Sequence, residues 1–513
     1  MNDEAGERPV ADEPPGDGPG SAAESPVVAP APVPEVPRPR PSASRPTAEF
    51  LVVLLLSVLL FRTFAAEAYI VPTGSMAPTL MGMHREVTCP DCRMRFAVGM
   101  DEQGRSGRAI CPNCGAEGID EGLSSERNGD RLLVQKYLFD WRPPRRWEVA
   151  VFQNPGDPSQ AYVKRVVALP GESVLIDGGD VVIDGRVARK SLAEQRAMRI
   201  LVYDHDFQPR DIARYPRWSC RVDRGGNRLA SAWKPEGTAF VHQADRNEHG
   251  RVDWLEYRHW DPDRGGYGPV RDFTPYNGGE VRGENRVDDL MLAAHVRLDP
   301  ESEGLALRLR SGSDTFVVTL ANSESAAPVI RRLGPGRTER RITPVDPVVG
   351  PLAAARDRPV LVEASLMDRR LTVAIDGVPL FEPIDYDDPA PGQGPWPWLS
   401  PLALGAIGEG GAEVSGLRVY RDVYYTSALA GALRRPFGVE VPYRLGRGEY
   451  FVLGDNSPVS NDSRFWAVSP VVREELLLGK PFLVHLPSRG LPLKVFGHET
   501  YWVPDPREIR YIR

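Results

Sequence analysis

The sequence predicts a mainly β protein, in which an antiparallel β domain follows an N-terminal transmembrane helix and is interrupted by an inserted β-sandwich. Short apolar runs separated by Gly, Asp and Pro turns fill most of the chain, which is typical of antiparallel sheets. One uninterrupted apolar run lies near the start, at 50–61, and the residue pattern changes between 191 and 436. The length of 513 residues also exceeds what a single core usually organises.

The composition excludes several classes of protein. The net charge is −7 with mixed signs, and no basic block is interleaved with aromatic residues, so we expect no nucleic-acid partner. Charged residues make up 26% of the chain, which is typical of a water-exposed exterior, so most of the chain is not embedded in lipid. Five cysteines are too few for a disulfide-dense secreted scaffold.

Residues 1–48 are rich in Pro, Ala, Glu and Asp and contain almost no aromatic residues. Such a segment cannot bury enough apolar surface to offset the entropy that it would lose on ordering. We therefore predict a disordered, Pro-rich tail on the cytoplasmic side of a membrane.

Residues 49–68 are predicted to form the membrane anchor. A span needs about 20 apolar residues, so the run at 50–61 suffices only if Arg62 reaches to the lipid interface. A cleaved signal peptide is the alternative. We predict an uncleaved anchor, because the turn that carries Ser75 follows only a few residues later. Basic residues before the run place the N-terminus inside; they are Arg38, Arg40 and Arg45.

The segment Val71–Leu80 contains a Gly-Ser turn between prolines. Gly74 gives the backbone before Ser75 access to dihedrals that other residues avoid, which would let the hydroxyl stand clear as a nucleophile. Thr73 offers a second hydroxyl two residues earlier. Taken alone, such a turn is most often only a loop, so its interpretation depends on stretches further along the chain.

Two Cys-x-x-Cys pairs follow, in the segment 89–115. Each pair places two thiolates on one face of a tight turn, and their spacing fits a zinc ribbon whose four ligands leave no open position for chemistry. The predicted ligands are Cys89, Cys92, Cys111 and Cys114. The alternative is a pair of disulfides or redox-active dithiols, because this segment would lie outside the cytoplasm. For His84, nearby in the sequence, we expect a surface position.

The antiparallel domain is predicted in three pieces, at 69–88, 126–190 and 437–513. The middle piece reads as a series of strands, because β-branched and aromatic residues alternate between turn residues. Its last two strands are joined by Asp177-Gly-Gly179, a good hairpin turn. The predicted strands are 129–137, 147–152, 162–169, 173–176 and 181–187.

Residues 191–436 are predicted to form the inserted β-sandwich, because short alternating strands follow one another between turns. Its strings Leu371–Phe381 and Val414–Tyr425 resemble concanavalin-like jelly rolls. We expect the insert to fold as a unit that is independent of the reactive serine. We expect Cys220 to be a buried free thiol. The predicted strands are 290–298, 305–310, 316–320, 360–364, 371–375 and 378–381.

Lys164 is the candidate partner of the serine. A serine hydroxyl is a poor nucleophile until a base takes its proton, and none of the eight histidines lies in a recognisable nucleophile–base context. Both faces of the strand around Lys164 are largely apolar, so burial would lower the pKa of its amine and make it a base. The alternative is an edge strand that leaves Lys164 and Arg165 in water.

Three stretches in this order after an anchor resemble the bacterial signal peptidase I family, also called leader peptidases. They are Val71–Leu80, Tyr162–Gly171 and Gly454–Arg464. The resemblance extends roughly over 50–80, 129–190 and 437–485, and it implies an antiparallel β catalytic fold of the signal peptidase type.

Carried over residue by residue, the resemblance implies that Ser75 is the nucleophile and Lys164 the general base. Thr73 stands where its hydroxyl would join the Ser75 amide in an oxyanion hole. Ser460 matches the serine that hydrogen-bonds the lysine amine and orients it.

The resemblance also implies supporting ion pairs. Asp462 and Arg464 match one such pair, and Asp455 sits where it could pair with Arg165. Two features depart from the family pattern. A cysteine pair follows Leu80, and a whole domain separates the lysine from the last motif, although insertions between strands cost little closure entropy.

We therefore predict a membrane-bound serine endopeptidase that uses a Ser-Lys dyad to cleave N-terminal signal peptides from exported preproteins. It would span the cytoplasmic, or inner, membrane once and act on its outer face. Catalysis would need no cofactor, and the zinc would be structural. The expected partners are preprotein signal peptides, the phospholipid membrane and the secretion machinery, with a carbohydrate or envelope ligand for 191–436.

Two alternative functions follow from the same sequence. One is a membrane-tethered carbohydrate- or envelope-binding protein with an inert peptidase fold, which loss of Ser75 or Lys164 would have favoured. The other is a Ser-Lys protease that cuts folded regulators, which the anchor placed just before the serine argues against.

Overall fold

The structure is a computed structural model. The chain divides into a unit that ends at Val58 and a unit that begins at Leu59. The structure describes residues 44–60, 66–101, 103–119, 125–211, 215–224, 227–229, 231–244, 252–334, 338–386, 400–427, 436–467, 469–491, 493–495, 498–500 and 503–512.

Helix α1 (Ser44–Leu60) contains the apolar run. Among the described residues, no helix has the length and apolarity that a membrane crossing requires. Most of the predicted disordered tail lies outside the described residues, but its last part, 44–48, is helical, so that boundary is wrong. The predicted anchor also ran too far: 61–65 are not described, and 66–68 belong to strand β1 (Ala66–Ile70), which pairs with the next strand of a sheet.

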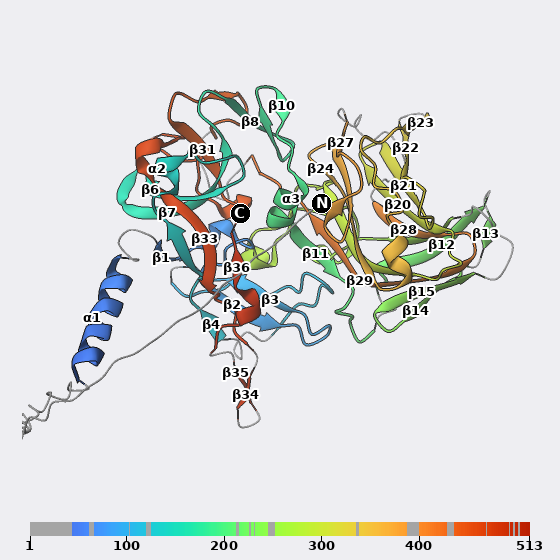
Figure 1. Cartoon of the computed structure of the whole chain (residues 1–513), viewed down its shortest axis with the longest axis horizontal. Coiled ribbons are helices and arrows are strands. Elements are labelled where there is room, and N and C mark those ends of the chain that lie inside the picture. Colours follow the sequence, from blue (N-terminus) through green and yellow to red (C-terminus); the bar gives the residue numbers. More distant parts are fainter. Residues whose placement is uncertain are drawn as a thin grey trace, which may run out of the picture. The chain divides into compact units, whose positions relative to one another are not determined.

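The first antiparallel sheet is built from strands that lie far apart in the sequence (Figure 1). Strand β7, which carries the predicted base, lies inside this sheet between β6 and β31. The prediction of a buried strand is therefore confirmed, and the edge-strand alternative is wrong. In sheet order the strands are β1, β5 (Arg131–Gln135), β33 (Leu477–Leu486), β6 (Val149–Asn154), β7 (Asp157–Ala168), β31 (Glu449–Leu453) and β32 (Val472–Arg473), with β36 (Arg510–Tyr511) paired to β33.

A smaller sheet contains the predicted hairpin. Strands β8 and β9 pair with Asp177 opposite Asp180, and both glycines between them have positive φ, so the turn prediction is confirmed. In order the strands are β10 (Arg186–Val187), β9 (Asp180–Ile183), β8 (Ser173–Asp177) and β30 (Tyr443–Arg444).

The cysteine segment is part of a short antiparallel sheet. The strands in order are β3 (Arg95–Gly99), β2 (His84–Thr88) and β4 (Ser125–Arg127). The first cysteine pair lies in the turn between β2 and β3. His84 is fully buried at the start of β2, and its Nδ1 lies 2.8 Å from the carbonyl oxygen of Gly82, so the predicted surface position is wrong.

The inserted segment folds into a sheet that packs against a second sheet, as predicted for a β-sandwich. The first contains, in order, β14 (Trp233–Glu236), β15 (Ala239–Ala244), β29 (Gly410–Arg421), β19 (Leu290–Leu298), β24 (Val360–Met367), β25 (Arg370–Ile375) and β26 (Val378–Pro379), with β11 (Ile200–Asp204) on β29 and β27 (Ile384–Asp385) on β25. The second contains β13 (Asn227–Leu229), β12 (Trp218–Arg224), β16 (Val252–Tyr257), β28 (Leu402–Ile407), β20 (Gly304–Ser311), β21 (Asp314–Ala321), β22 (Val329–Leu333) and β23 (Glu339–Ile342).

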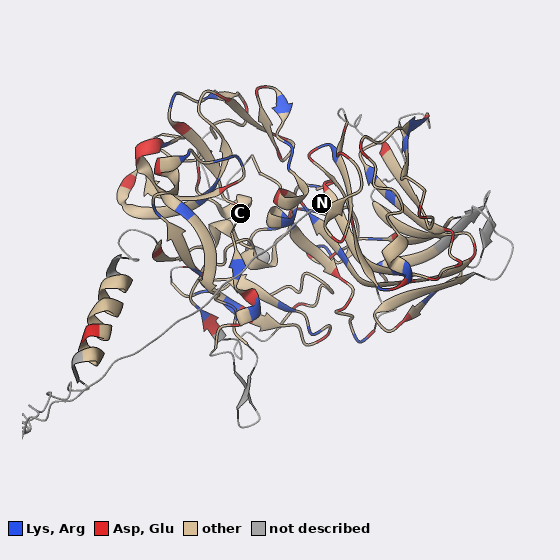
Figure 2. Cartoon of the chain, viewed as in Figure 1, with Lys and Arg blue, Asp and Glu red and all other residues tan. Residues whose placement is uncertain are grey.

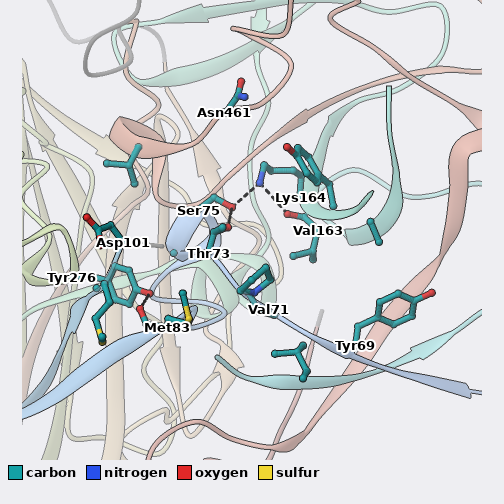
Figure 3. Close-up of a pocket in the computed structure, with 18 of the residues that line it drawn as sticks. Tyr69, Val71, Thr73, Ser75, Met83, Asp101, Val163, Lys164, Tyr276 and Asn461 are labelled. Carbon is teal, nitrogen blue, oxygen red and sulfur yellow. Dashed lines mark hydrogen bonds between the residues drawn. The ribbon is translucent and has the colours of Figure 1, made fainter. Parts of the chain in front are cut away.

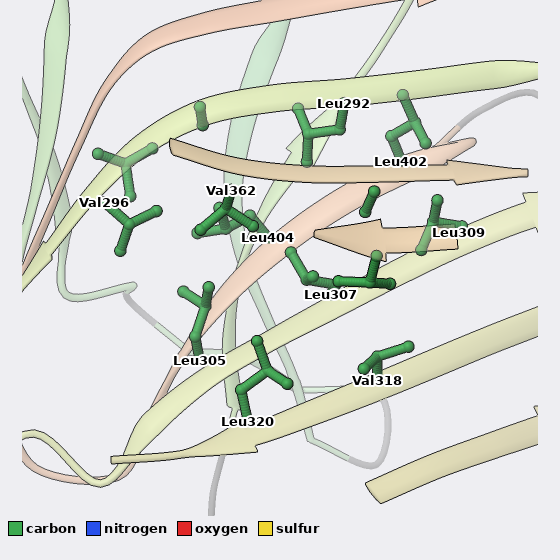
Figure 4. Close-up of a cluster of buried hydrophobic side chains, with 14 of the residues drawn as sticks. Leu292, Val296, Leu305, Leu307, Leu309, Val318, Leu320, Val362, Leu402 and Leu404 are labelled. Atoms are coloured by element: carbon green, nitrogen blue, oxygen red, sulfur yellow. The ribbon is translucent and has the colours of Figure 1, made fainter. Parts of the chain in front are cut away.

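Aliphatic side chains from both sheets fill the space between them (Figure 4). Leu292 and Val362 come from the first sheet, and Leu307, Val318 and Leu404 come from the second. Alternate residues of each strand point inward. The same alternation predicted all of these strands in the sequence except β28. Asp376 and Gly377, which both have positive φ, form the hairpin turn that joins β25 to β26.

The remaining elements are short. Charged residues of both signs are interspersed over the described strands (Figure 2), as 63 basic and 70 acidic residues lead one to expect. The short elements are α2 (Leu138–Trp141), α3 (Leu192–Met198), η2 (Gly74–Met76), η4 (Pro275–Glu280), η6 (Ala353–Arg356), η8 (Ser457–Val459), η9 (Glu474–Leu476), η10 (Pro506–Glu508), β17 (Trp260–Asp261), β18 (Gly266–Tyr267), β34 (Leu493–Val495) and β35 (His498–Thr500).

Candidate active site

The serine turn follows β1 directly and is held by buried neighbours. Ser75 lies in the short helix η2, and the side chains of Met76 and Leu80 after it are fully buried. Gly74 does not have the left-handed backbone that the sequence argument assumed. It is glycine for reasons of space, because a Cβ at this position would overlap the ring of Tyr276.

The side chains of Ser75 and Lys164 meet in a cavity of 790 Å³ (Figure 3). Lys164 Nζ lies 2.6 Å from Ser75 Oγ and 3.3 Å from the carbonyl oxygen of Val163. The two residues are far apart in the sequence, and it is the pairing of β7 with its neighbours in the sheet that fixes the position of the lysine. This distance is short enough for direct proton transfer between hydroxyl and amine.

Lys164 is held in surroundings that favour its neutral form. Its side chain is buried, with 4% exposed, and burial lowers the pKa of the amine to about 8. The charges of Asp462 and Asp455 oppose this shift, while that of Arg464 adds to it. Desolvation outweighs the two carboxylates because each of them is already paired with an arginine.

The two predicted ion pairs are both formed, and both are buried. Arg165 donates to Asp455 from Nε at 2.7 Å and from Nη2 at 2.5 Å. Arg464 donates in the same forked manner to Asp462, at 2.9 and 2.7 Å. The hydroxyl of Thr79 also donates to Asp455 at 2.5 Å, so this carboxylate ties the serine turn to the end of β31.

The other two predicted hydroxyls differ in their positions. Thr73 Oγ1 donates to Ser75 Oγ at 3.4 Å, on the side of the serine away from the lysine (Figure 3). Ser460 is fully buried, but its hydroxyl has no hydrogen-bond partner among the described residues, so the predicted bond to the amine of Lys164 is not formed. The amine instead contacts Ser75 directly.

The four paired cysteines converge. Their sulfur atoms all lie within 4.8 Å of one another, and the pairs Cys89–Cys114 and Cys92–Cys111 are 3.5 Å apart. All four thiols are free. Ion–sulfur distances of about 2.3 Å in a tetrahedron place sulfur atoms about 3.8 Å apart, so this donor set fits a zinc ion. Cys220 is also free, but it is only partly buried, contrary to the prediction.

Parts of this chain are similar in sequence to known signal peptidases. Residues 123–248 and 411–486 match the family described as signal peptidase, peptidase S26. The signal peptidase I of Leptolyngbya laminosa is 32% identical over 30% of this chain and 61% of its own length. The probable signal peptidase I-1 of Synechocystis is 38% identical over 13% of this chain and 38% of its own length.

These matches support the signal peptidase I family. The chain spans less than two thirds of the length of these curated relatives. Lys164 and Asp455 lie inside the segments that match the signal peptidase family, whereas Ser75 lies before them. The matched segments also extend into both ends of the predicted insert, and they leave 249–410 unmatched between them.

The comparison of folds adds a weak likeness. The carbohydrate binding module CBM66 from Bacillus subtilis aligns with a TM-score of 0.24 and 9% identity, over 40% of this chain and 94% of that one. A likeness at this level carries no argument about the insert. A carbohydrate or envelope ligand for the inserted sandwich therefore stays a prediction.

Sequence reasoning missed three residues next to the signal peptidase-like site. Asn456 lay inside a motif that the sequence singled out, but we assigned it no role. Tyr276 and Asn277 belong to the insert, which we expected to be independent of the serine, yet both line its cavity. Whether the site depends on the insert stays a prediction. No local sequence signal indicated this contact, because it depends on how the insert packs.

Proposed function

We propose that the protein is a membrane-bound serine endopeptidase that removes signal peptides from exported preproteins by means of a Ser75–Lys164 dyad. The observation that carries the proposal is the 2.6 Å distance between Lys164 Nζ and Ser75 Oγ. The match to the signal peptidase family supports it independently, because that match covers the lysine and the C-terminal ion pairs.

In the proposed reaction, the neutral amine of Lys164 takes the proton of Ser75 while Oγ attacks the carbonyl carbon of the scissile peptide bond. The tetrahedral oxyanion is stabilised by the hydroxyl of Thr73 and the backbone N–H of Ser75. The ammonium then donates its proton to the departing amine. Water, activated by the same lysine, attacks the acyl-enzyme and releases the cleaved signal peptide.

The apolar helix supports the membrane part of the proposal. The large apolar side chains from Phe50 to Val58 are 47–65% exposed. A helix that is apolar all round and exposes these side chains is typical of a segment that contacts lipid. We propose that the N-terminus is cytoplasmic, that the cavity faces the outer side of the inner membrane, and that the substrates come from the secretion machinery.

The test is cleavage of a synthetic preprotein by the detergent-solubilised full chain. We expect cleavage after small residues at −1 and −3, which is the pattern that signal peptides carry at their cleavage site. Ser75→Ala should abolish it. The matched control is an exposed serine, Ser325, whose hydroxyl contacts only that of Ser323 among the described side chains, so Ser325→Ala should cleave normally. Absence of cleavage by the parent protein, or equal cleavage by Ser75→Ala, would contradict the proposal.

We further propose that Cys89, Cys92, Cys111 and Cys114 hold one structural zinc ion. The convergence of four free thiols supports this proposal, and four thiolates leave no site open for a reacting group. Elemental analysis should find one zinc per chain, and Cys111→Ser should lose it and unfold at a lower temperature. Absence of zinc together with no titratable thiols would instead support two disulfides.

A further inference from the structure

An asparagine of the insert forms a reciprocal amide pair beside the serine turn. Asn277 Nδ2 donates to Asn456 Oδ1 at 2.9 Å, and Asn456 Nδ2 donates to Asn277 Oδ1 at 2.7 Å. The two residues come from η4 of the insert and from the loop after β31. Two opposed bonds between planar amides fix both side chains in one orientation.

Asn456 passes this constraint to the backbone on both sides of the reactive hydroxyl. Its Nδ2 also donates to the carbonyl oxygen of Gly74 at 2.9 Å, and its backbone N–H donates to the carbonyl oxygen of Ser75 at 3.0 Å. The orientation of Asn277 is therefore linked, through one residue, to the position of Ser75.

Tyr276 also packs against the serine turn. Its hydroxyl donates to the carbonyl oxygen of Met83 at 2.9 Å, and its ring is buried (Figure 3). The ring fills the space where Gly74 and Gly99 would carry a Cβ, so both positions are matched to it. Tyr276 and Asn277 also line the cavity that contains the dyad.

We propose that Asn277 and Tyr276 are positioning residues of the hydrolytic site, and that the inserted domain is therefore an integral part of that site. The inference rests on the proposed function. Both residues lie outside the segments that match the signal peptidase family, so these contacts with the serine turn are made by the insert. Asn277 acts through Asn456 on the Ser75 backbone, and the ring of Tyr276 packs against Gly74 of the same turn.

The test compares Asn277→Ala, Asn456→Ala and the double variant in the full chain. Displacement of a nucleophile by about 1 Å can cost about 100-fold in rate. We therefore expect Asn277→Ala to lower kcat about 10- to 100-fold and to change KM less than about 3-fold. In the double variant, loss of Asn277 should have no further effect, because its action passes through Asn456.

The matched control is Asn285→Ala, in the same part of the insert. Asn285 Nδ2 donates to Asp272 at 2.7 Å, within the insert, so this variant disturbs the insert without touching the serine turn. It should keep parental kcat. Equal losses in Asn277→Ala and Asn285→Ala, or independent additive losses in the double variant, would show that Asn277 only stabilises the fold and would overturn the proposal.

A second readout separates this inference from the proposed function. The NMR signal of 13C-labelled Lys164 reports its contact with Ser75 whether or not the protein cleaves preproteins. We expect Asn277→Ala to shift the titration of this signal and Asn285→Ala to leave it unchanged. If the parent cleaves nothing but this difference is present, the proposed function fails and the positioning role stands. An unchanged lysine signal in Asn277→Ala overturns the positioning role.

Discussion

Two buried lysines of this molecule differ in their electrostatic surroundings. Lys164 is 4% exposed and Lys190 is 2% exposed, so both have lost almost all contact with water. Lys190 Nζ donates to Asp368 at 2.6 Å and to Asp422 at 2.7 Å, and these carboxylates raise the pKa of its amine well above the ordinary value. No carboxylate of the described residues contacts Lys164, and burial lowers the pKa of its amine to about 8.

The difference shows that burial alone does not lower the pKa of a lysine amine. Both amines lose the same kind of hydration, and the outcome is decided by whether a carboxylate is free to bind the ammonium. Near Lys164, Asp455 and Asp462 are each occupied by a forked arginine. The two arginines thus neutralise both carboxylates, so neither carboxylate binds the ammonium form of Lys164.

The largest expected effect comes from exchanging each lysine for arginine. Lys164→Arg should lower kcat/KM by at least about 1,000-fold, because a guanidinium stays protonated and cannot accept the proton of Ser75. Lys190→Arg should keep most activity, because its position requires only a cation. Preprotein cleavage with folding checked by circular dichroism measures both. Substantial activity in Lys164→Arg would show that Lys164, like Lys190, is needed only as a cation and would contradict its role as a base.

Removal of the charge at Lys190 should act on stability. Lys190→Met leaves Asp368 and Asp422 buried without their shared cation, and breaking such a pair costs about 3–5 kcal/mol in the free energy of unfolding. Denaturant unfolding of this variant beside Lys164→Met measures the contrast. Lys164→Met should be neutral or stabilising, since Asp455 and Asp462 keep their arginine partners. Equal destabilisation would mean that Lys164 is also charged in the folded protein.

Thr73→Val should reduce the chemical step without affecting the lysine. Loss of one oxyanion donor costs about 100- to 1,000-fold in kcat in comparable sites. Single-turnover cleavage of the preprotein isolates this step, and Thr73→Ser should restore most of the rate because it returns the hydroxyl. If Val and Ser behave alike, the hydroxyl does not stabilise the oxyanion.

The smallest expected effect concerns pH. Activity of the parent should rise with pH along a limb near pH 8, because only the neutral amine of Lys164 can act as a base. Asp455→Asn removes a negative charge that raises the pKa of this amine, so the limb should move to lower pH. The pH profile of kcat/KM, recorded well below the unfolding temperature of the variant, measures the shift. A limb that moves to higher pH would contradict the account.

The sequence predicted the parts of this site that depend on local pattern. The apolar residues on both faces of the strand around Lys164 indicated that the strand is buried, and the resemblance to signal peptidase I implied the arginine–carboxylate pairs. It did not predict that His84 would be buried or that Ser460 would lack the amine as a partner. Those positions depend on side-chain packing between segments that are distant in the chain.

The contact of the insert with the serine turn is a second feature that the sequence did not predict, because it also depends on packing between distant segments. Asn277 lies in a stretch with no chemical motif of its own, and its partner Asn456 is far away in the sequence. Only the packing of the insert against the peptidase-like sheet brings the two amides together. Turn residues such as Gly178 and Gly179 were predictable because the backbone conformation that they allow is a local property.

Direct titration of the two buried amines tests whether Lys164 has a lowered pKa and Lys190 a raised one. The full chain, labelled with 13C at the lysine ε-carbons, would be titrated by NMR. The variants Lys164→Arg and Lys190→Arg would each remove one signal and so assign the two buried lysines. The remaining signals belong to Lys136, Lys234, Lys480 and Lys494. We expect Lys164 to lose its proton near pH 8 and Lys190 to remain charged above the ordinary lysine pKa. A Lys164 signal that stays charged through about pH 10, near the ordinary lysine pKa, would contradict this expectation.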